Sequence, residues 1–232
     1  MIFLCMISYV DYERFSGLGD MALLKEVSRG NEAAFAVLLD RYVEVVSRNA
    51  FRIMCDREDS EAVTRKVFIS LWNDVMDYDD RFELWEWLLR KTCIFSRIRI
   101  SRRRILRLFG VTTDVFVQAS PKVEDHDDYV TKQAWELYCR ASTHLTPLQR
   151  AAYALCELEG IRSDRAAMMT GMSRLRMELA LQRGAEKIRH ELERYAREND
   201  YEAYVGFLRK VAESMTDYDR LKKSIIEEIF RD

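Results

Sequence analysis

Apolar residues recur every three or four positions along most of this chain, and this spacing restricts the possible folds more than any other feature. That period places one apolar stripe on an α-helix, whereas a half-buried strand would alternate at every second residue. The sequence holds only 8 glycines and 2 prolines in 232 residues, too few for the frequent turns of an all-β protein. We therefore predict an all-α fold. The clearest example is the set Phe35, Leu38, Leu39, Tyr42, Val45, Val46, Ala50 and Ile53.

The residue types that hold metals, disulfides or catalytic machinery form no recognisable pattern. The 5 cysteines are scattered without a CxxC pair, as expected of thiols in a reducing compartment, and the 3 histidines share no ligand-like spacing with them. The phosphate-binding loops GxGxxG and GxxxxGK do not occur, and no paired histidine and carboxylate site is evident. We expect no cofactor, no metal site and no enzymatic activity.

The first ten residues, MIFLCMISYV, are apolar but match neither a signal peptide nor a membrane span. A signal peptide needs a basic start and a small-residue cleavage site, and this segment has neither. The segment is also shorter than the roughly 20 residues that cross a bilayer. We predict an N-terminal tail, no membrane insertion and a cytoplasmic protein.

Breaks in the helical pattern divide the chain into four parts. Residues 15–108 hold four amphipathic helices and form a first domain. Residues 109–127 lose the periodicity, contain Pro121 and an acidic run, and predict a linker. Residues 128–195 form a second helical domain. Residues 196–232 form a C-terminal helical extension that we expect to pack onto the second domain, although a docking or autoinhibitory tail is the alternative.

Residues that favour helix starts stand at most of these breaks. Thr146 and Pro147 occupy the N-cap and first helical positions that those residue types prefer. Either Asp79 or Asp80 is expected to begin the fourth helix of the first domain. The other predicted N-caps are Asp20, Asp56, Ser163, Ser173 and Asp217.

The stretch from Phe82 to Leu108 combines aromatic and basic side chains and has no acidic residue after Glu86. The net charge of the chain is −2, so any nucleic-acid binding must come from a local patch. Phosphates attract the cations and unstacked bases stack on the rings. A solvated basic helix end with its tryptophans in the core is the alternative. The candidate DNA contacts are Trp85, Trp87, Arg90, Lys91, Arg97, Arg99, Arg102, Arg103 and Arg104.

Residues 163–195 have a helix-turn-helix pattern, with a short helix, a turn at Gly171 and a longer helix. The first turn of the longer helix is expected to enter the major groove, with Arg174, Arg176 and Met177 toward bases. Cations further along suit phosphates. A helical corner that binds nothing is the alternative. The candidate DNA contacts here are Ser173, Arg174, Arg176, Met177, Arg183 and Lys187.

Residues 20–192 resemble the extracytoplasmic-function sigma factors, the small two-domain group of bacterial sigma-70-type initiation factors. The segment DMALLKEVSRGNEAAFAVLLDRY is similar to the usual start of that family, and DREDSEAVTRKVFISLW is similar to its region 2.2. The stretch beginning WLLRKTC is similar to regions 2.3 and 2.4. LTPLQRAAYALCELEGIRSDRAAMMTGMSRLRMELALQRGAEKIR is similar to region 4.

The resemblance implies a protein that binds core RNA polymerase and promoter DNA, with an anti-sigma factor as a further partner. The first domain would contact the −10 element and help melt the duplex, and the second would contact the −35 element. The helix similar to region 2.2 would meet the polymerase. The polymerase contacts that the resemblance implies are Asp56, Asp59, Glu61, Arg65, Lys66, Phe68 and Trp72.

The chain departs from the family pattern at several positions, and the segment after Tyr195 lies outside that pattern. Arg65 and Lys66 stand where the family usually has Gln and Glu, and Ile94 and Ile98 stand where it usually has Asn and Asp. These departures favour an alternative function, a sigma-like regulatory or scaffold protein that acts through protein contacts without directing initiation. The basic block at 97–107 favours initiation. In the free protein we expect the two domains to pack together and mask the DNA surfaces.

Overall fold

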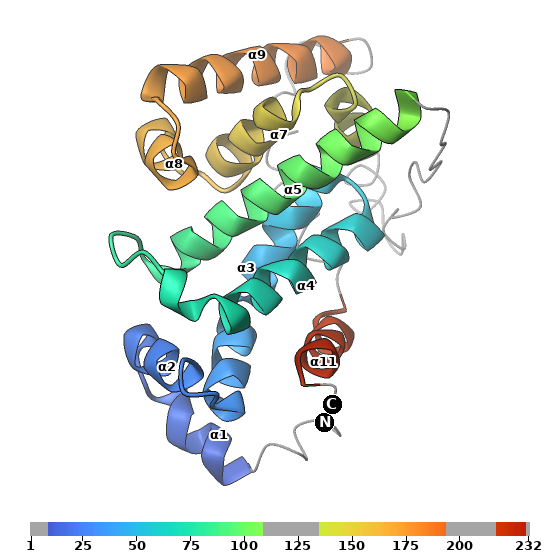
Figure 1. Cartoon of the computed structure of the whole chain (residues 1–232). Coiled ribbons are helices and arrows are strands. Elements are labelled where there is room, and N and C mark those ends of the chain that lie inside the picture. Colours follow the sequence, from blue (N-terminus) through green and yellow to red (C-terminus); the bar gives the residue numbers. More distant parts are fainter. Residues whose placement is uncertain (1–8, 109–134, 194–216, 231–232) are drawn as a thin grey trace, which may run out of the picture.

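The computed structural model describes residues 9–108, 135–193 and 217–230, and within these ranges the regular structure is entirely helical (Figure 1). The all-α prediction is confirmed. The predicted linker at 109–127 lies outside the described residues. None of the helices in the described part is both long and apolar enough to cross a membrane.

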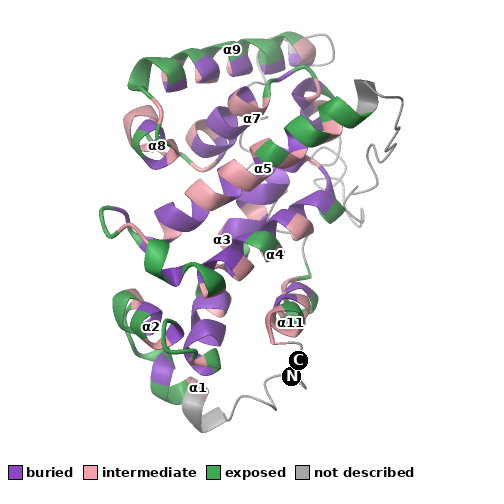
Figure 2. Cartoon of the chain, in the orientation of Figure 1, coloured by how far each residue is buried: buried purple, intermediate pink, exposed green. Residues whose placement is uncertain are grey.

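The first half of the chain is a bundle built around one long central helix, α3 (Glu32–Met54), which contacts every other helix listed below. Its buried side runs along most of its length (Figure 2), because the apolar residues recur at the helical period. The remaining helices are α1 (Tyr9–Ser16), α2 (Asp20–Val27), α4 (Arg57–Asn73) and α5 (Leu84–Leu108). Helix α1 forms part of what the sequence predicts as a tail, and its Phe15 is buried.

The second half contains the predicted helix-turn-helix. Residues 135–142 are helical and precede α7 (Pro147–Tyr153), the π-helical turn η3 (Ala154–Leu158), α8 (Ser163–Thr170) and α9 (Arg174–Glu193). Gly171 ends α8 in the left-handed conformation with φ 68°, which glycine adopts without a steric penalty. Ala166 and Ala167 are buried in α8, which packs against α9.

Most of the predicted helix starts are confirmed by hydrogen bonds. The Asp56 carboxylate accepts from the Asp59 amide at 2.7 Å, and Asp217 caps α11 (Tyr218–Ile229) in the same way. Thr146 and Gln149 form a complete capping box, which satisfies two otherwise unpaired amides. The Ser173 hydroxyl accepts from the Arg176 amide at 3.3 Å.

Three predicted helix starts are displaced. Asp20 is the first residue of α2 rather than its cap, because its carboxylate instead accepts hydrogen bonds from Arg41 and Tyr42 of α3. Ser163 is likewise inside α8 and makes no capping bond. Helix α5 begins at Leu84 rather than near residue 80, since Asp79 is held in a local turn by Arg81.

The two halves pack against each other, as expected for the free protein. Helix α5 runs between α3 and α4 of the first bundle on one side and α7 and α8 on the other (Figure 1). At the same boundary, the Trp135 ring stacks on Phe51 of α3 with centroids 4.6 Å apart. The Tyr138 hydroxyl donates to the Arg52 carbonyl at 2.7 Å. Aromatic burial and satisfied polar groups therefore both hold the halves together.

An ion pair between Arg165 of α8 and Glu86 of α5 crosses the same boundary. The Arg165 hydrogen bonds hold the pKa of the buried Glu86 carboxyl below its ordinary value, against the effect of burial. A lowered folded-state pKa gives stability that is present above the unfolded pKa of about 4.3 and is lost as pH falls through the folded value.

We therefore expect Glu86→Gln to destabilise the protein most at neutral pH and progressively less below about pH 4. Urea unfolding of both forms at pH 7 and at pH 3.5 measures the difference. Glu58→Gln, at an exposed carboxylate of α4, is the matched control. A difference between wild type and Glu86→Gln that stays constant with pH would contradict the assignment.

Candidate functional site

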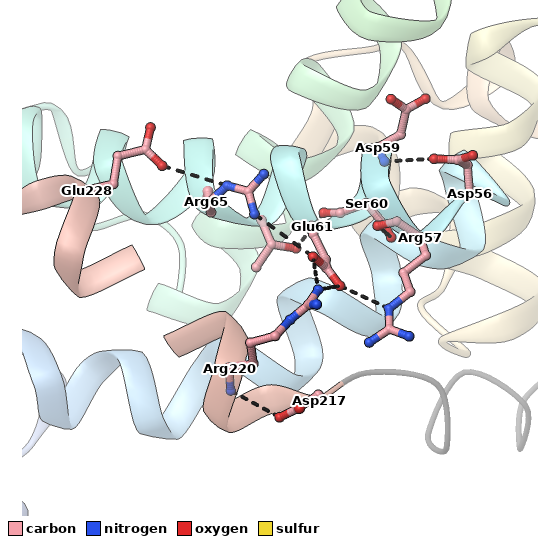
Figure 3. A network of polar contacts seen from close by, with 10 residues as sticks. Asp56, Arg57, Asp59, Ser60, Glu61, Arg65, Asp217, Arg220 and Glu228 are labelled. Atoms are coloured by element: carbon pink, nitrogen blue, oxygen red, sulfur yellow. Dashed lines mark hydrogen bonds and ion pairs between the residues drawn. The ribbon is translucent and has the colours of Figure 1, made fainter. Parts of the chain in front are cut away.

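The outer face of α4 carries a network of charged side chains that centres on Glu61 (Figure 3). The Glu61 carboxylate accepts from Arg57, one turn earlier, at 3.0 Å. It also accepts from Arg220 of the C-terminal helix α11 at 2.8 and 2.9 Å. Arg65, one turn further along α4, lies 3.6 Å from the Glu228 carboxylate of α11. The sequence-predicted contacts Glu61 and Arg65 are thus on one surface, and α11 already contacts it.

Three of the predicted polymerase contacts are buried in this conformation. Asp56 is a buried cap, and Phe68 is fully enclosed in the core. Asp59 is fully buried and forms ion pairs with Arg99 and Arg103 of α5. Burial raises the pKa of the Asp59 carboxyl even though the two guanidinium groups act to lower it. These residues hold α4 in place and are not available to a partner here, which corrects the prediction.

The other predicted polymerase contacts are accessible to different extents. The Lys66 ammonium is exposed and lies 4.9 Å from the centre of the Phe95 ring. The Trp72 ring is half-buried and packs edge-to-face with Phe230 at 4.8 Å. Lys66 therefore remains open on α4, whereas Trp72 has a neighbour from the C-terminal extension.

The two tryptophans of α5 differ in their surroundings. Trp85 is half-buried and donates from its indole nitrogen to the Glu83 carboxylate at 2.8 Å. Trp87 is only 2% exposed, and the Lys91 ammonium lies 4.7 Å from its ring centre. A base cannot stack on a ring that is enclosed in the core, so the predicted DNA contact at Trp87 is corrected. Its neighbour Leu88 is fully buried, which agrees with the inward face of the helix.

Several basic residues of α5 already have partners within the protein. Arg99 and Arg103 bind Asp59, and Arg104 donates to the Leu145 carbonyl of the second half. Arg90 lies over the Phe82 ring at 5.8 Å. Among the outward positions of the stretch are Arg102, which is exposed, Arg97, which is half-buried, and the departures Ile94 and Ile98, the latter 53% exposed.

The helix-turn-helix presents most of its predicted DNA contacts to solvent. Ser173, Arg174 and Arg176 are exposed at the start of α9, and Arg174 pairs with Glu178 at 2.6 Å. Met177 is fully buried in the core, on a side of α9 that packs against the rest of the protein, and its predicted contact with bases is corrected. Further along α9, Arg183 is exposed, and the exposed Lys187 donates to the His144 carbonyl at 3.1 Å.

Two groups of surface residues were not predicted. The apolar side chains Met168, Leu175 and Leu179 are exposed on α8 and α9, beside the arginines. The residues of α11 that contact the first half were also missed. Their signal was the amphipathic pattern at 217–230, which requires a buried partner surface, but that pattern does not identify the partner. Helix α11, the described part of the extension, packs on α3 and α4 of the first half, which corrects the expected packing onto the second.

The candidate functional residues lie on extended surfaces, which are typical of sites that bind nucleic acids or proteins. Among the described residues no group of three or more histidine, cysteine or acidic side chains is placed to hold a metal ion. The charged face of α4, the basic side of α5 and the start of α9 are the candidate interfaces. Ion pairs and hydrogen bonds within the protein cover part of each.

Comparisons with known proteins agree with the resemblance in the sequence. No family model matches the chain. The sequence is 24% identical to the ECF RNA polymerase sigma factor SigE of Mycolicibacterium smegmatis over 162 residues, which are 69% of this chain and 62% of that protein. The chain thus spans less than two thirds of this curated relative. The match establishes homology to the extracytoplasmic-function sigma factors.

Two solved structures are similar. The structure of CnrH in complex with the cytosolic domain of CnrY matches with a TM-score of 0.54 and 20% identity, over 76% of this chain and 99% of that one. It supports the all-α fold. Bartonella quintana RpoE, solved in complex with the anti-sigma factor NepR, matches at 0.49 with 18% identity, over 66% of this chain and 94% of that one.

Proposed function

We propose that this chain, which is a homologue of the extracytoplasmic-function sigma factors, binds core RNA polymerase in the bacterial cytoplasm and directs promoter recognition and transcription initiation. The observation that carries the proposal is the combination, on one chain of sigma-factor homology, of the α4 and α5 bundle with an arginine-bearing helix-turn-helix. Neither part alone distinguishes initiation from general DNA binding.

The residues outside the core are consistent with different partners for the two halves. The outer face of α4, with Glu61, Arg65 and Lys66, is the polymerase surface. Trp85 and the outward arginines of α5 supply the ring and the charge that a displaced strand requires. Arg174 and Arg176 at the start of α9 are placed to contact base edges or phosphates in a duplex.

In the free protein, several of these side chains already have partners within the chain. Arg104 of α5 donates to the Leu145 carbonyl of the second half, and Glu86 joins the halves through Arg165. Release of Arg104 therefore requires the halves to separate, which is a role for polymerase or for release of an anti-sigma factor. Such a partner needs to bind the open form more tightly than the closed form.

A second function is supported by a specific observation. Met168, Leu175 and Leu179 present exposed apolar surface on the helix-turn-helix. Leu175 and Leu179 stand one turn apart on α9, and exposed apolar side chains on one face favour protein contacts. Together with the departures at Arg65 and Lys66, this favours a regulator or scaffold that does not direct initiation. DNA binding separates the two functions.

If α9 reads duplex DNA, Arg174→Ala and Arg176→Ala are each expected to weaken promoter binding on the order of tenfold. Fluorescence anisotropy with labelled promoter fragments and core polymerase measures the change. Arg81→Ala, at an exposed arginine far along the chain from α9, is the matched control. A sigma factor should also lose affinity steeply as salt rises, because bound cations release counterions from the phosphates. Salt-independent binding unaffected by either variant would favour the scaffold function.

A further inference from the structure

We infer that the C-terminal helix α11 is a built-in competitor for the α4 surface, which it occupies in the free protein and must leave before polymerase binds there. The inference rests on the proposed function, because α4 is the proposed polymerase contact. Helix α11 packs against α4 and α3, beside the first bundle (Figure 1).

The apolar side of α11 is seated on the first bundle. Leu221 and Ile225 are fully buried there. Beyond the end of the helix, the Phe230 ring packs edge-to-face with Trp72 at 4.8 Å and with Phe35 at 6.0 Å. Edge-to-face rings at these separations attract each other beyond the area that they bury. The contact is therefore specific to this face of the bundle.

Ion pairs at both ends of α11 fix its position along α4. Near its start, Arg220 binds Glu61. Near its end, Glu228 faces Arg65 at 3.6 Å (Figure 3). Each pair is opposite in sign, and a shift of Arg220 by one turn of α4 in either direction would place it beside Arg57 or Arg65 instead of Glu61. The arrangement gives α11 one favoured register on α4.

The residues that α11 covers include those predicted to bind polymerase. Glu61, Arg65 and Trp72 all contact it. Two departures from the family pattern also meet here, since Arg65 stands where the family usually has Gln and its partner Glu228 lies in the extra C-terminal segment. Arg65, which departs from the family pattern on α4, thus has a carboxylate partner, Glu228, in α11.

The contact is built to be released. The Arg220 and Glu228 side chains are 62% and 53% exposed, and exposed ion pairs contribute little each. A helix of 12 residues is marginal without a surface to pack on. A polymerase that binds the same face can therefore displace α11 without unfolding the bundle.

The test reverses the charges that face α4 in the full chain. Arg220→Glu with Glu228→Arg keeps the net charge and the buried Leu221 and Ile225, but places like charges against Glu61 and Arg65. The matched control is Lys223→Glu with Glu227→Lys, which exchanges a pair that lies within α11 itself. Hydrogen exchange of α4 and α11 reports release, and titration with purified core polymerase reports affinity.

We expect the reversed variant to exchange faster in α11 and to bind core polymerase about tenfold more tightly, because apparent affinity is reduced by the fraction of molecules in which the site is covered. The control should match the wild type in both measurements. Faster exchange with unchanged affinity would overturn the competition while leaving polymerase binding intact. Absence of polymerase binding by every form would overturn the proposed function, and with it the competition.

Discussion

Replacing Arg52 by alanine is expected to lower the free energy of unfolding by about 3–5 kcal/mol, the range for breaking a buried ion pair by removing one partner. The Arg52 side chain is 3% exposed and pairs with Glu159 of the second half at 2.5 Å. It also donates to the Leu158 carbonyl at 3.2 Å. Its loss removes this donor from the Leu158 carbonyl and leaves Glu159, whose side chain is 10% exposed, with the longer contact to Arg48.

Urea unfolding measures the change, and small-angle scattering reports whether the two halves remain packed. Arg48→Ala is the control, because Arg48 reaches the same Glu159 at 3.3 Å from a more exposed position and should cost less. A loss for Arg52→Ala no larger than that for Arg48→Ala, with a compact scattering profile, would contradict the role given to this pair.

Phe35→Ala is expected to cost a similar amount, about 3–5 kcal/mol, because it removes a large ring from a packed interior and leaves a cavity. The Phe35 ring is fully buried and meets Trp72 at 5.4 Å and Phe68 at 6.5 Å. It also meets Phe230, so part of the loss should appear as release of α11. Urea unfolding and hydrogen exchange of α11 measure the two effects.

Phe35→Leu is the matched control, since leucine refills part of the space and should cost less. If both substitutions destabilise equally, the ring contacts are not what stabilises this region. If the amides of α11 exchange at the wild-type rate in Phe35→Ala, then the packing of Phe230 on the bundle does not depend on the Phe35 ring.

The helices could be predicted because their signals are local. The apolar period predicts α3 and α4 along most of their length, and Asp56 and Thr146 cap where their residue types favour caps. Asp20 shows the limit of that inference. Its carboxylate instead accepts a hydrogen bond from Tyr42 of α3. A local sequence signal does not predict a partner that is distant in the sequence.

The residue types of the candidate site could be predicted from the sequence, but not which of their side chains face solvent. Composition marks residues 82–108 as aromatic and basic, yet Trp87 faces the core while Trp85 is half-buried. Met177 follows the arginines of α9 in sequence, but its side chain is fully buried whereas theirs are exposed. Which residues face outward is set by packing between helices, and a list of residue types does not contain that information.

The position of α11 could not be predicted from its own sequence for a related reason. Its amphipathic pattern requires a surface to cover, and both halves of the chain offer one. The choice is made by matched charges and rings, Arg220 on Glu61 and Phe230 on Trp72, which become visible only when segments distant in sequence are brought together.

Titration of bacterial core RNA polymerase into the labelled full chain, alongside the variant with reversed α11 charges, tests the central claim most directly. The account predicts saturable binding by both forms, tighter for the variant, with displacement by an unlabelled sigma factor of the same family. Absence of binding by both forms, while hydrogen exchange shows α4 uncovered in the variant, would contradict it. The chain would then be a sigma-like protein that acts through other contacts.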